Sequence, residues 1–415
     1  MPQPFQAPAV VLDPEVGGIG IIHSLGPVGV PIICVERRWP PRLGHLSRFV
    51  RQSVFVRSAA GQALADALVQ LGQRLRERAV LYPSTDAQLE VLIDHYDSLS
   101  EFFHVPVNRA VGHRLFLKSW QYDLARELGV PTAAHVHFRG GESPDVGQLR
   151  FPLIVKPVAR VEAEGGSAFR LRIVESPESL LPCVEELARA HPGRLFQLAE
   201  NIPGDSSTLV TVGSYSDRGG KVLASYTGRK LTQWPPTHGS ASVAESVSLP
   251  GEVVEYAKAL LEHGRIHGIT QVEFKRDPRD GLYKLIEING RAWSWIKLAT
   301  ESGINLPLLQ YADLAAPNLL DDFVARRQVN DCFFVQDYHV ALNRSVAERS
   351  LIRNLSRHKR RVLAMWYPGE WRLWIAHRVI TAAKVLRERL RVRRDSGKGE
   401  FTGYGADLFK GQAAV

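Results

Sequence analysis

The stretch from Gln271 to Arg291, QVEFKRDPRDGLYKLIEINGR, constrains the fold of this chain more than any other. Two runs of alternating residues, 271–275 and 282–289, flank a turn that contains Asp280-Gly281. An Asp-Gly pair between alternating runs is a strong signal for a β-hairpin. The sequence therefore predicts two paired antiparallel strands here.

The alternation also predicts which side chains of this hairpin lie together. Glu287 and Asn289 are two residues apart and share one face of their strand, and Glu273 faces away from its two apolar neighbours. Pairing of the strands brings Glu273 beside that face, with Arg291 just beyond. Two carboxylates and an amide oxygen suit Mg²⁺ or Mn²⁺. The alternative is a solvated hairpin with an acidic outer face, but the apolar shoulders favour a buried one, where acids need a partner or a metal.

Length and cysteine content set the broad class of the protein. A chain of 415 residues predicts two or three domains. The three cysteines, Cys34, Cys183 and Cys332, are far apart and lack metal-site spacing, which favours a reducing cytoplasm. We see no signal peptide and no run long enough for a membrane-spanning helix.

The positive charge of the chain is concentrated near its C-terminus. The net charge is +9, and residues 340–394 alone hold 15 Lys/Arg and 3 Asp/Glu, a net of +12. Residues 351–361 and 370–394 are predicted to be basic helices with Trp residues beside them. Such helices contact an anionic membrane from the cytoplasmic side, bind another polyanion, or cover the body of the protein as solvated helices. No aromatic pattern typical of RNA binding is present, so nucleic acid is not the expected partner.

The N-terminal region reads as a parallel α/β domain. A strand at 8–12, a glycine-rich turn at 17–20, a helix to Leu25 and a strand at 29–35 make a βαβ unit. The glycine spacing is not G-x-G-x-x-G, so we interpret the glycines as permitting a tight strand-to-helix turn. Further alternating strands and helices complete this domain near residue 110.

Three upstream motifs suggest anion binding. Lys118 precedes a helix that Gly129 and Pro131 terminate, and Lys156 ends the apolar strand at 151–157. A Gly-Gly-Ser loop at 165–167 can bring backbone N–H groups close to phosphates. Each motif also has an ordinary structural explanation: a solvated lysine, a lysine reaching solvent from a strand end, and a flexible loop.

A strand at 195–200 leads into the kinked segment Asn201–Gly204. Further along, Arg229 and Lys230 follow a strand at 221–226. Because these two basic residues alternate, only one can point inward, and we favour Lys230.

Taken in order, these motifs resemble the ATP-grasp superfamily over residues 117–315. The segments around TGRKL and VEFKRDPRDG are similar to predicted carboxylate–amine ligases and D-aspartate-ligase-like members. The resemblance implies an α/β fold with a parallel-sheet N-terminal domain at 1–112 and a two-lobed ATP-grasp domain at 113–325. The lid lobe is expected at about 130–200, and residues 326–415 form a basic, mostly helical extension.

The resemblance also implies roles for individual residues. ATP would be bound by Lys118, Lys156, Gly165, Gly166, Ser167, Glu200, Ile202 and Asp205; Mg²⁺ or Mn²⁺ by Glu273, Glu287 and Asn289; and Arg291 and Lys230 would be catalytic. The implied reaction joins a carboxylate to an amine, both small molecules, through an acyl phosphate, with release of ADP and phosphate. Two alternatives stay open: a kinase or thiol ligase of the same superfamily, or a nonenzymatic ATP-binding or polyanion-binding protein.

Overall fold

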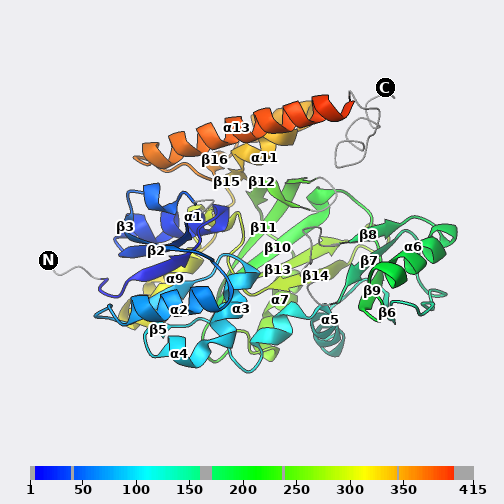
Figure 1. The fold of residues 1–415 in the computed structure, drawn as a ribbon, viewed down its shortest axis with the longest axis horizontal. Coiled ribbons are helices and arrows are strands. Elements are labelled where there is room, and N and C mark those ends of the chain that lie inside the picture. Colours follow the sequence, from blue (N-terminus) through cyan, green and yellow to red (C-terminus); the bar gives the residue numbers. More distant parts are fainter. Residues whose placement is uncertain (1–4, 39–41, 159–170, 236–238, 344, 397–415) are drawn as a thin grey trace.

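The structure is a computed structural model that describes residues 5–38, 42–158, 171–235, 239–343 and 345–396, with the side chains of 388, 389 and 391–396 excepted. Its N-terminal part is a parallel sheet of five strands in the order β3-β2-β1-β4-β5 (Figure 1). The predicted parallel α/β domain is therefore confirmed. The strands are β1 Ala9–Leu12, β2 Ile32–Arg37, β3 Val50–Val56, β4 Ala79–Tyr82 and β5 Phe103–His104.

Helices cover both faces of this sheet. The helices of this part are α1 Val16–Leu25, α2 Gly61–Gly72, α3 Asp86–Asp94 and α4 Tyr96–Ser100. One apolar core holds side chains of α2 and α3, such as Leu68 and Leu92. A second core holds Ile19 and Ile22 of α1 together with residues of the central part of the chain. The sheet is therefore buried on both sides, as continuous apolar strands such as β1 require.

The glycines at 17–20 do not form the predicted turn; they lie inside α1. A methyl group on Gly17 would lie 3.0 Å from the carbonyl oxygen of Trp293, and one on Gly20 would lie 3.0 Å from Ile296 Cγ2. The glycines thus let α1 approach the segment at 293–297 closely. The reason for the error is that sequence alone does not distinguish a glycine needed for a turn from one needed for close packing.

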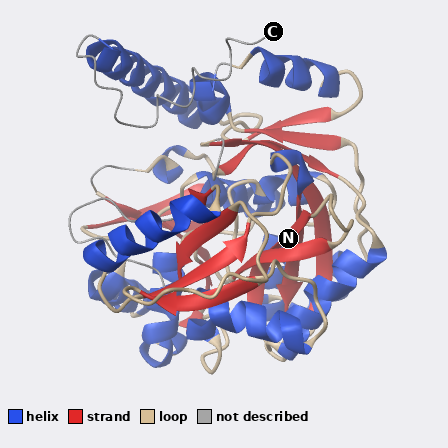
Figure 2. Cartoon of the chain, turned by 90° about the vertical axis from the view of Figure 1, so that its right-hand side faces the viewer, coloured by secondary structure: helices blue, strands red, loops and turns tan. Residues whose placement is uncertain are grey.

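The central part of the chain is a sheet of seven strands in the order β14-β13-β10-β11-β12-β15-β16. All pairs are antiparallel except β15 with β16. Figure 2 shows the strands gathered inside the molecule with helices on its outside. The strands are β10 Leu209–Ser216, β11 Val222–Trp234, β12 Ser240–Ser246, β13 Gly268–Arg276, β14 Tyr283–Asn289, β15 Cys332–Val335 and β16 Arg360–Leu363. The helices are α7 Gly251–His263, α8 Ile296–Glu301, α9 Leu306–Ala315, α10 Leu320–Val324, α11 Asp337–Asn343 and α12 Val346–Leu355.

A small lobe with its own core lies at the predicted lid position, to the right in Figure 1. Helix α5 (Lys118–Glu127) precedes it, and its sheet has the order β6-β9-β7-β8 with helix α6 (Pro177–Ala190). The strands are β6 His135–Arg139, β7 Leu153–Pro157, β8 Arg172–Val174 and β9 Leu195–Glu200.

The described residues of the C-terminal segment are mostly helical, as predicted, but the segment also contributes two strands that were not predicted. Strands β15 and β16 extend the central sheet, and α12 ends at Leu355, so the helix predicted at 351–361 is only partly correct. The reason is burial: all four residues of β15 are buried against the sheet. The predicted basic helix at 370–394 is present as α13 (Trp371–Ser396), which lies along the upper side of the molecule in Figure 1. Within the described residues, no helix is both long and apolar enough to cross a bilayer.

Candidate active site

The hairpin predicted at 271–291 is formed by β13 and β14. Glu273 lies directly opposite Glu287, and Gln271 lies opposite Asn289. The turn closes with hydrogen bonds from the Asp277 N–H to the Leu282 carbonyl (2.8 Å) and from the Gly281 N–H to the Asp277 carbonyl (2.7 Å). The apolar neighbours in both strands are buried, so the two carboxylates share the opposite face of the sheet.

Two like charges directly opposite each other are unfavourable unless cations offset them. Lys118 Nζ of α5 lies 2.9 Å from Glu287 Oε2, and Lys230 Nζ of β11 lies 3.4 Å from Glu273 Oε1. The Asn289 amide donates to Glu287 Oε1 at 3.0 Å. The structure thus brings together five of the residues predicted to act in the site.

The two carboxylates have shifted pKa values in opposite directions. Burial, with the Glu287 charge adding to it, raises the pKa of Glu273. The Lys118 ammonium beside Glu287 holds the pKa of that carboxyl well below its usual range. Burial opposes the charged form of Lys118, but the Glu287 carboxylate outweighs it and raises the pKa of Lys118. Opposed shifts in neighbouring groups are typical of functional sites.

Alternation along β11 decides which basic residue faces the carboxylates. Lys230 is 7% exposed and points toward Glu273. Arg229 points the other way, where it and Lys359 hold Glu245 in ion pairs of 2.5 and 2.6 Å. Lys230 is therefore the inward residue of the pair.

Lys156 approaches the same region from β7 of the small lobe. Its ammonium lies 3.4 Å from the Tyr122 hydroxyl and 5.3 Å from the centre of the Tyr122 ring. Burial lowers the pKa of Lys156. Among the described residues no carboxylate forms an ion pair with it. Tyr122 was not predicted, because a Tyr on an amphipathic helix reads as a core residue.

Acceptor atoms of Glu200 and Ile202, two residues predicted to bind ATP, are bonded within the protein. Glu200 accepts from the Arg150 backbone N–H at 3.0 Å and pairs with Arg279 at 3.0 Å. The Ile202 carbonyl accepts from Lys275 Nζ at 2.7 Å.

Asp205 is exposed, and its carboxylate accepts from the Ser207 N–H at 2.9 Å and the Ser207 hydroxyl at 2.6 Å. It therefore caps a short turn in this structure. Gly165, Gly166 and Ser167 lie outside the described residues.

Arg291 lies where the central sheet meets the N-terminal domain. Its Nε is 2.7 Å from Asp86 Oδ1, at the start of α3 just beyond β4. Asp86 was missed because an acid in the first turn of a helix has a sufficient local reason to be there. Arg291 also lines a small cavity with Tyr82 and Gln310.

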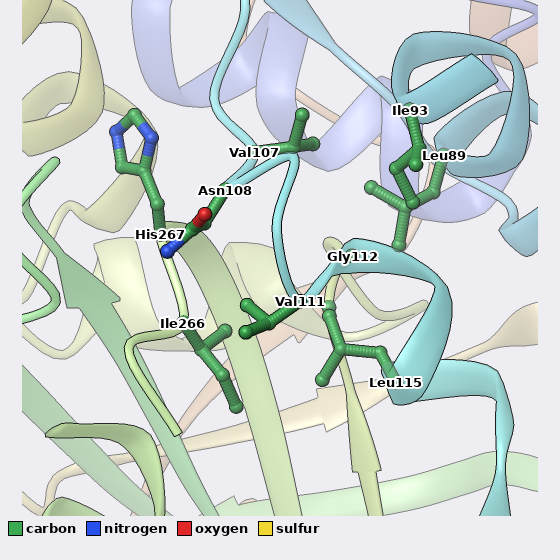
Figure 3. Close-up of a pocket in the computed structure, with 10 residues that line it drawn as sticks. Leu89, Ile93, Val107, Asn108, Val111, Gly112, Leu115, Ile266 and His267 are labelled. Atoms are coloured by element: carbon green, nitrogen blue, oxygen red, sulfur yellow. The ribbon is translucent and has the colours of Figure 1, made fainter. Parts of the chain in front are cut away.

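A second pocket is shown in Figure 3. Apolar side chains of α3 and of residues 107–115 face Ile266 there. The carboxylates and lysines described above are not among its lining residues, so the charged cluster is a separate place in the fold.

The donor set of the cluster fits a divalent cation. The described residues contain no group of three or more His, Cys, Asp or Glu that could hold a metal. An ion here would instead have the Glu273 and Glu287 carboxylates and the Asn289 amide oxygen, leaving further positions for ligand oxygens. The two facing carboxylates would attract such a cation.

A parallel N-terminal sheet, a small four-stranded lobe and an antiparallel sheet carrying an acidic hairpin make up the ATP-grasp fold, as the sequence predicted. Three solved structures have similar folds at 13–16% identity. The L-amino acid ligase from Bacillus licheniformis matches with a TM-score of 0.55, over 78% of this chain and 75% of its own. The biotin carboxylase–β,γ-ATP complex from Campylobacter jejuni has a TM-score of 0.58, over 75% and 70%. The N5-carboxyaminoimidazole synthetase from Staphylococcus aureus, complexed with ADP, has a TM-score of 0.56, over 79% of each chain.

One curated relative is similar in sequence. D-aspartate ligase of Enterococcus faecium (strain Aus0004) is 26% identical over 243 residues, which is 55% of this chain. The match spans 57% of that relative's own length. No protein-family model matches the chain.

Proposed function

We propose that this protein is an ATP-dependent ligase that joins a carboxylate to an amine through an acyl phosphate. The observation that carries the proposal is the opposed pair Glu273 and Glu287, with Lys118 and Lys230 in contact with it. Such a cluster can hold a divalent cation on one side and phosphate oxygens on the other. The sequence likeness to D-aspartate ligase supports the same reaction class.

Each residue of the cluster has a role in this proposal. Glu273, Glu287 and Asn289 would hold Mg²⁺, which when bound neutralises charge on the transferred phosphoryl group. Lys118 and Lys156 would bind phosphate oxygens from two sides, because one extends from α5 and the other from the lid lobe. Glu200, Ile202, Asp205 and the loop at 165–167 would bind the rest of the nucleotide.

The chemistry needs no covalent enzyme nucleophile. A carboxylate oxygen of the substrate bonds to the γ-phosphorus as the bond to ADP breaks. The amine nitrogen then bonds to the acyl carbon, the carbon–oxygen bond to phosphate breaks, and the nitrogen loses a proton. Arg291, held by Asp86, would stabilise the oxyanion that develops between these events. Lys230 would orient the carboxylate or the γ-phosphate.

We propose that the two substrates are a small-molecule carboxylate and a small-molecule amine of the cytoplasm. Amino acids are the first substrates to test, because the curated relative is named for D-aspartate. The chain would be incubated with Mg-ATP, D-aspartate and a panel of carboxylates and amines, and the nucleotide product identified. We expect ADP and phosphate in amounts equal to the amide formed.

The Glu287→Gln variant should lose turnover by at least about 100-fold while its melting temperature stays near that of the wild type. Glu245→Gln is the matched control, since Glu245 is also a cation-paired carboxylate of the same sheet but pairs with Arg229 and Lys359. Full activity of Glu287→Gln would refute the metal assignment. Production of AMP and pyrophosphate would exclude the acyl phosphate.

A further inference from the structure

Helix α13 exposes a row of large apolar side chains. Trp371, Ile375, Val379, Leu386 and Leu390 are each between 48% and 63% exposed. At 3.6 residues per turn, these five positions fall within an arc of about 100° around the helix. They make one continuous stripe, which we call the α13 apolar row, rather than scattered surface residues.

The row is not the face that attaches α13 to the protein. Leu373, His377 and Thr381 are buried and lie on roughly the opposite side of the helix from the row. Leu373 joins the same apolar core as Val362 of β16. Figure 1 shows α13 along the edge of the molecule, above β15, β16 and α11. One side of the helix is therefore anchored, and the apolar row faces away from that anchored side.

The charge on α13 identifies the kind of surface that fits the row. Between Trp371 and Ser396 the sequence holds eight Lys/Arg and two Asp/Glu. Arg372, Arg378, Lys384 and Arg387 are exposed. The Arg372 guanidinium lies 5.4 Å from the centre of the Trp371 ring. An apolar row on a strongly basic helix is the pattern of helices that lie in the interface of an anionic membrane.

We propose that α13 docks the protein onto the surface of an anionic lipid bilayer, with the α13 apolar row at the boundary between headgroups and acyl chains. The exposed side chains of Arg372, Arg378 and Arg387, which lie within or beside the row, contact the lipid phosphates. This inference is independent of the ligase reaction, because none of the cluster residues lies on α13. The helix rests on the surface and does not cross it.

Two other partners for the exposed face of α13, a second copy of the chain and a nucleic acid, fit it less well. A second copy of α13 would bring eight further basic side chains against the same row, and like charges repel. A nucleic acid would pair with the basic side chains, but four of the five side chains of the row are aliphatic, and only Trp371 offers a ring on which a base can stack. A bilayer satisfies both features.

Co-sedimentation of the full chain with lipid vesicles tests the proposal. One set of vesicles is phosphatidylcholine alone, and the other contains about one third phosphatidylglycerol. We expect binding to the anionic vesicles to be at least about tenfold stronger than to the neutral ones, and to weaken as salt is raised. ATP turnover, followed in parallel, should not depend on the variants described next.

Two triple variants measure separately how the α13 apolar row and the basic side chains contribute to vesicle binding. The triple change Ile375→Ser, Val379→Ser and Leu386→Ser should lower anionic-vesicle binding by about tenfold or more, since the buried apolar area is lost. Arg372→Gln with Arg378→Gln and Arg387→Gln should also lower the binding and should weaken its salt dependence, because three of the eight basic residues are removed. Leu181→Ser is the control, because Leu181 is an equally exposed leucine on α6, 60% exposed and outside α13.

Several outcomes would overturn the proposal. These are no sedimentation with anionic vesicles at low salt, or binding that the serine triple variant leaves unchanged. Binding to heparin or RNA that survives the serine triple variant, without vesicle binding, would identify a polyanion site instead. Dimerisation in solution that the same variant abolishes, again without vesicle binding, would identify a second copy as the occupant.

Discussion

The candidate site depends on single alternating positions in β11, β13 and β14. Glu273 and Glu287 meet because the hairpin register places them opposite each other, and Lys230 reaches them because it lies on the inner face of β11. Its neighbour Arg229 carries the same charge but faces Glu245. If the pairing of a strand shifted by one residue, each of its side chains would turn to the opposite face of the sheet.

Replacing each of the two basic residues of β11 in turn tests this placement. Lys230→Met should lower kcat by about 100-fold, because the ammonium beside Glu273 is lost from the reacting region. Arg229→Met should change kcat little, since Lys359 still pairs with Glu245. Steady-state ADP release on the purified variants measures both. Equal losses in the two variants would argue against a site role for Lys230.

At the scale of elements, close packing explains the glycine-rich helix α1. A methyl group at Gly20 would lie 3.0 Å from Ile296 Cγ2 and 3.3 Å from the Lys297 nitrogen. Helical Gly→Ala usually stabilises by about 1 kcal/mol. Here we expect Gly20→Ala to reduce the free energy of unfolding by about 1–3 kcal/mol, because the core has no room for the methyl group.

Gly251→Ala on α7 is the matched control for this prediction, since a methyl group there meets nothing within 4 Å. Urea unfolding should show the Gly251 variant as stable as the wild type or slightly more so. A Gly20 variant that is equally stable would mean that α1 and α8 can separate without cost.

The segment before α13 is anchored by a buried carboxylate. Glu370 accepts from the Arg48 backbone N–H at 2.8 Å and the Ser47 hydroxyl at 3.1 Å, and His23 Nε2 lies 3.4 Å from it. Burial, together with the nearby Lys297 charge, lowers the pKa of His23 to about 4, although Glu370 opposes the shift. The contacts with His23, Ser47 and Arg48 lower the pKa of Glu370 against the effect of burial.

These shifts predict a loss of stability in acid. His23 takes up its proton near pH 6.5 in the unfolded chain but near pH 4 in the folded one, so the unfolded state binds more protons between these values. The free energy of unfolding should therefore fall by up to about 3 kcal/mol as the pH drops from 6.5 to 4. The lowered pKa of Glu370 acts in the same direction as the pH falls further.

His23→Gln should make the unfolding midpoint fall less between pH 6.5 and pH 4 than it does in the wild type, while His104, His339 and His377, whose pKa values burial also lowers to about 4, keep part of the acid loss. His113→Gln, at an exposed histidine that does not contact Glu370, is the control variant. If the His23 variant keeps the full acid loss, His23 does not contribute to it.

At the scale of the whole molecule, the C-terminal segment belongs to the body of the protein. Strand β15 pairs with β12, and Cys332, Phe333 and Phe334 are completely buried in the central sheet. Lys297 of α8 also donates to the carbonyl of Leu363 at 3.1 Å. Residues 326–370 therefore complete the sheet that carries the candidate site.

Truncation tests whether the central sheet needs β15 and β16 in order to fold. A chain that ends at residue 325 should be insoluble or unfold at much lower temperature, because the edge of β12 and its apolar surroundings are exposed. The full chain is the reference for its solubility and its melting temperature. Thermal unfolding measures both, and a stable, active chain of 325 residues would show that β15 and β16 are dispensable.

The sequence by itself determined the class of fold, the hairpin and its acidic face. These follow from local rules: period-two alternation sets which side chains share a face, and Asp-Gly favours the turn. Lys118 and Lys156 were found in the same way, from a lysine at the boundary of a predicted element. The chain order of such motifs carried the resemblance to the ATP-grasp superfamily.

Only the tertiary structure decided the partners of these residues. Asp86 meets Arg291, Lys275 meets the Ile202 carbonyl, and Tyr122 meets Lys156 across long separations in the chain. The same holds for the glycines of α1 and for β15 and β16, whose conformation depends on the surfaces they pack against. Contacts between distant segments leave no local pattern, because each residue also has an ordinary reason to occupy its own helix or strand.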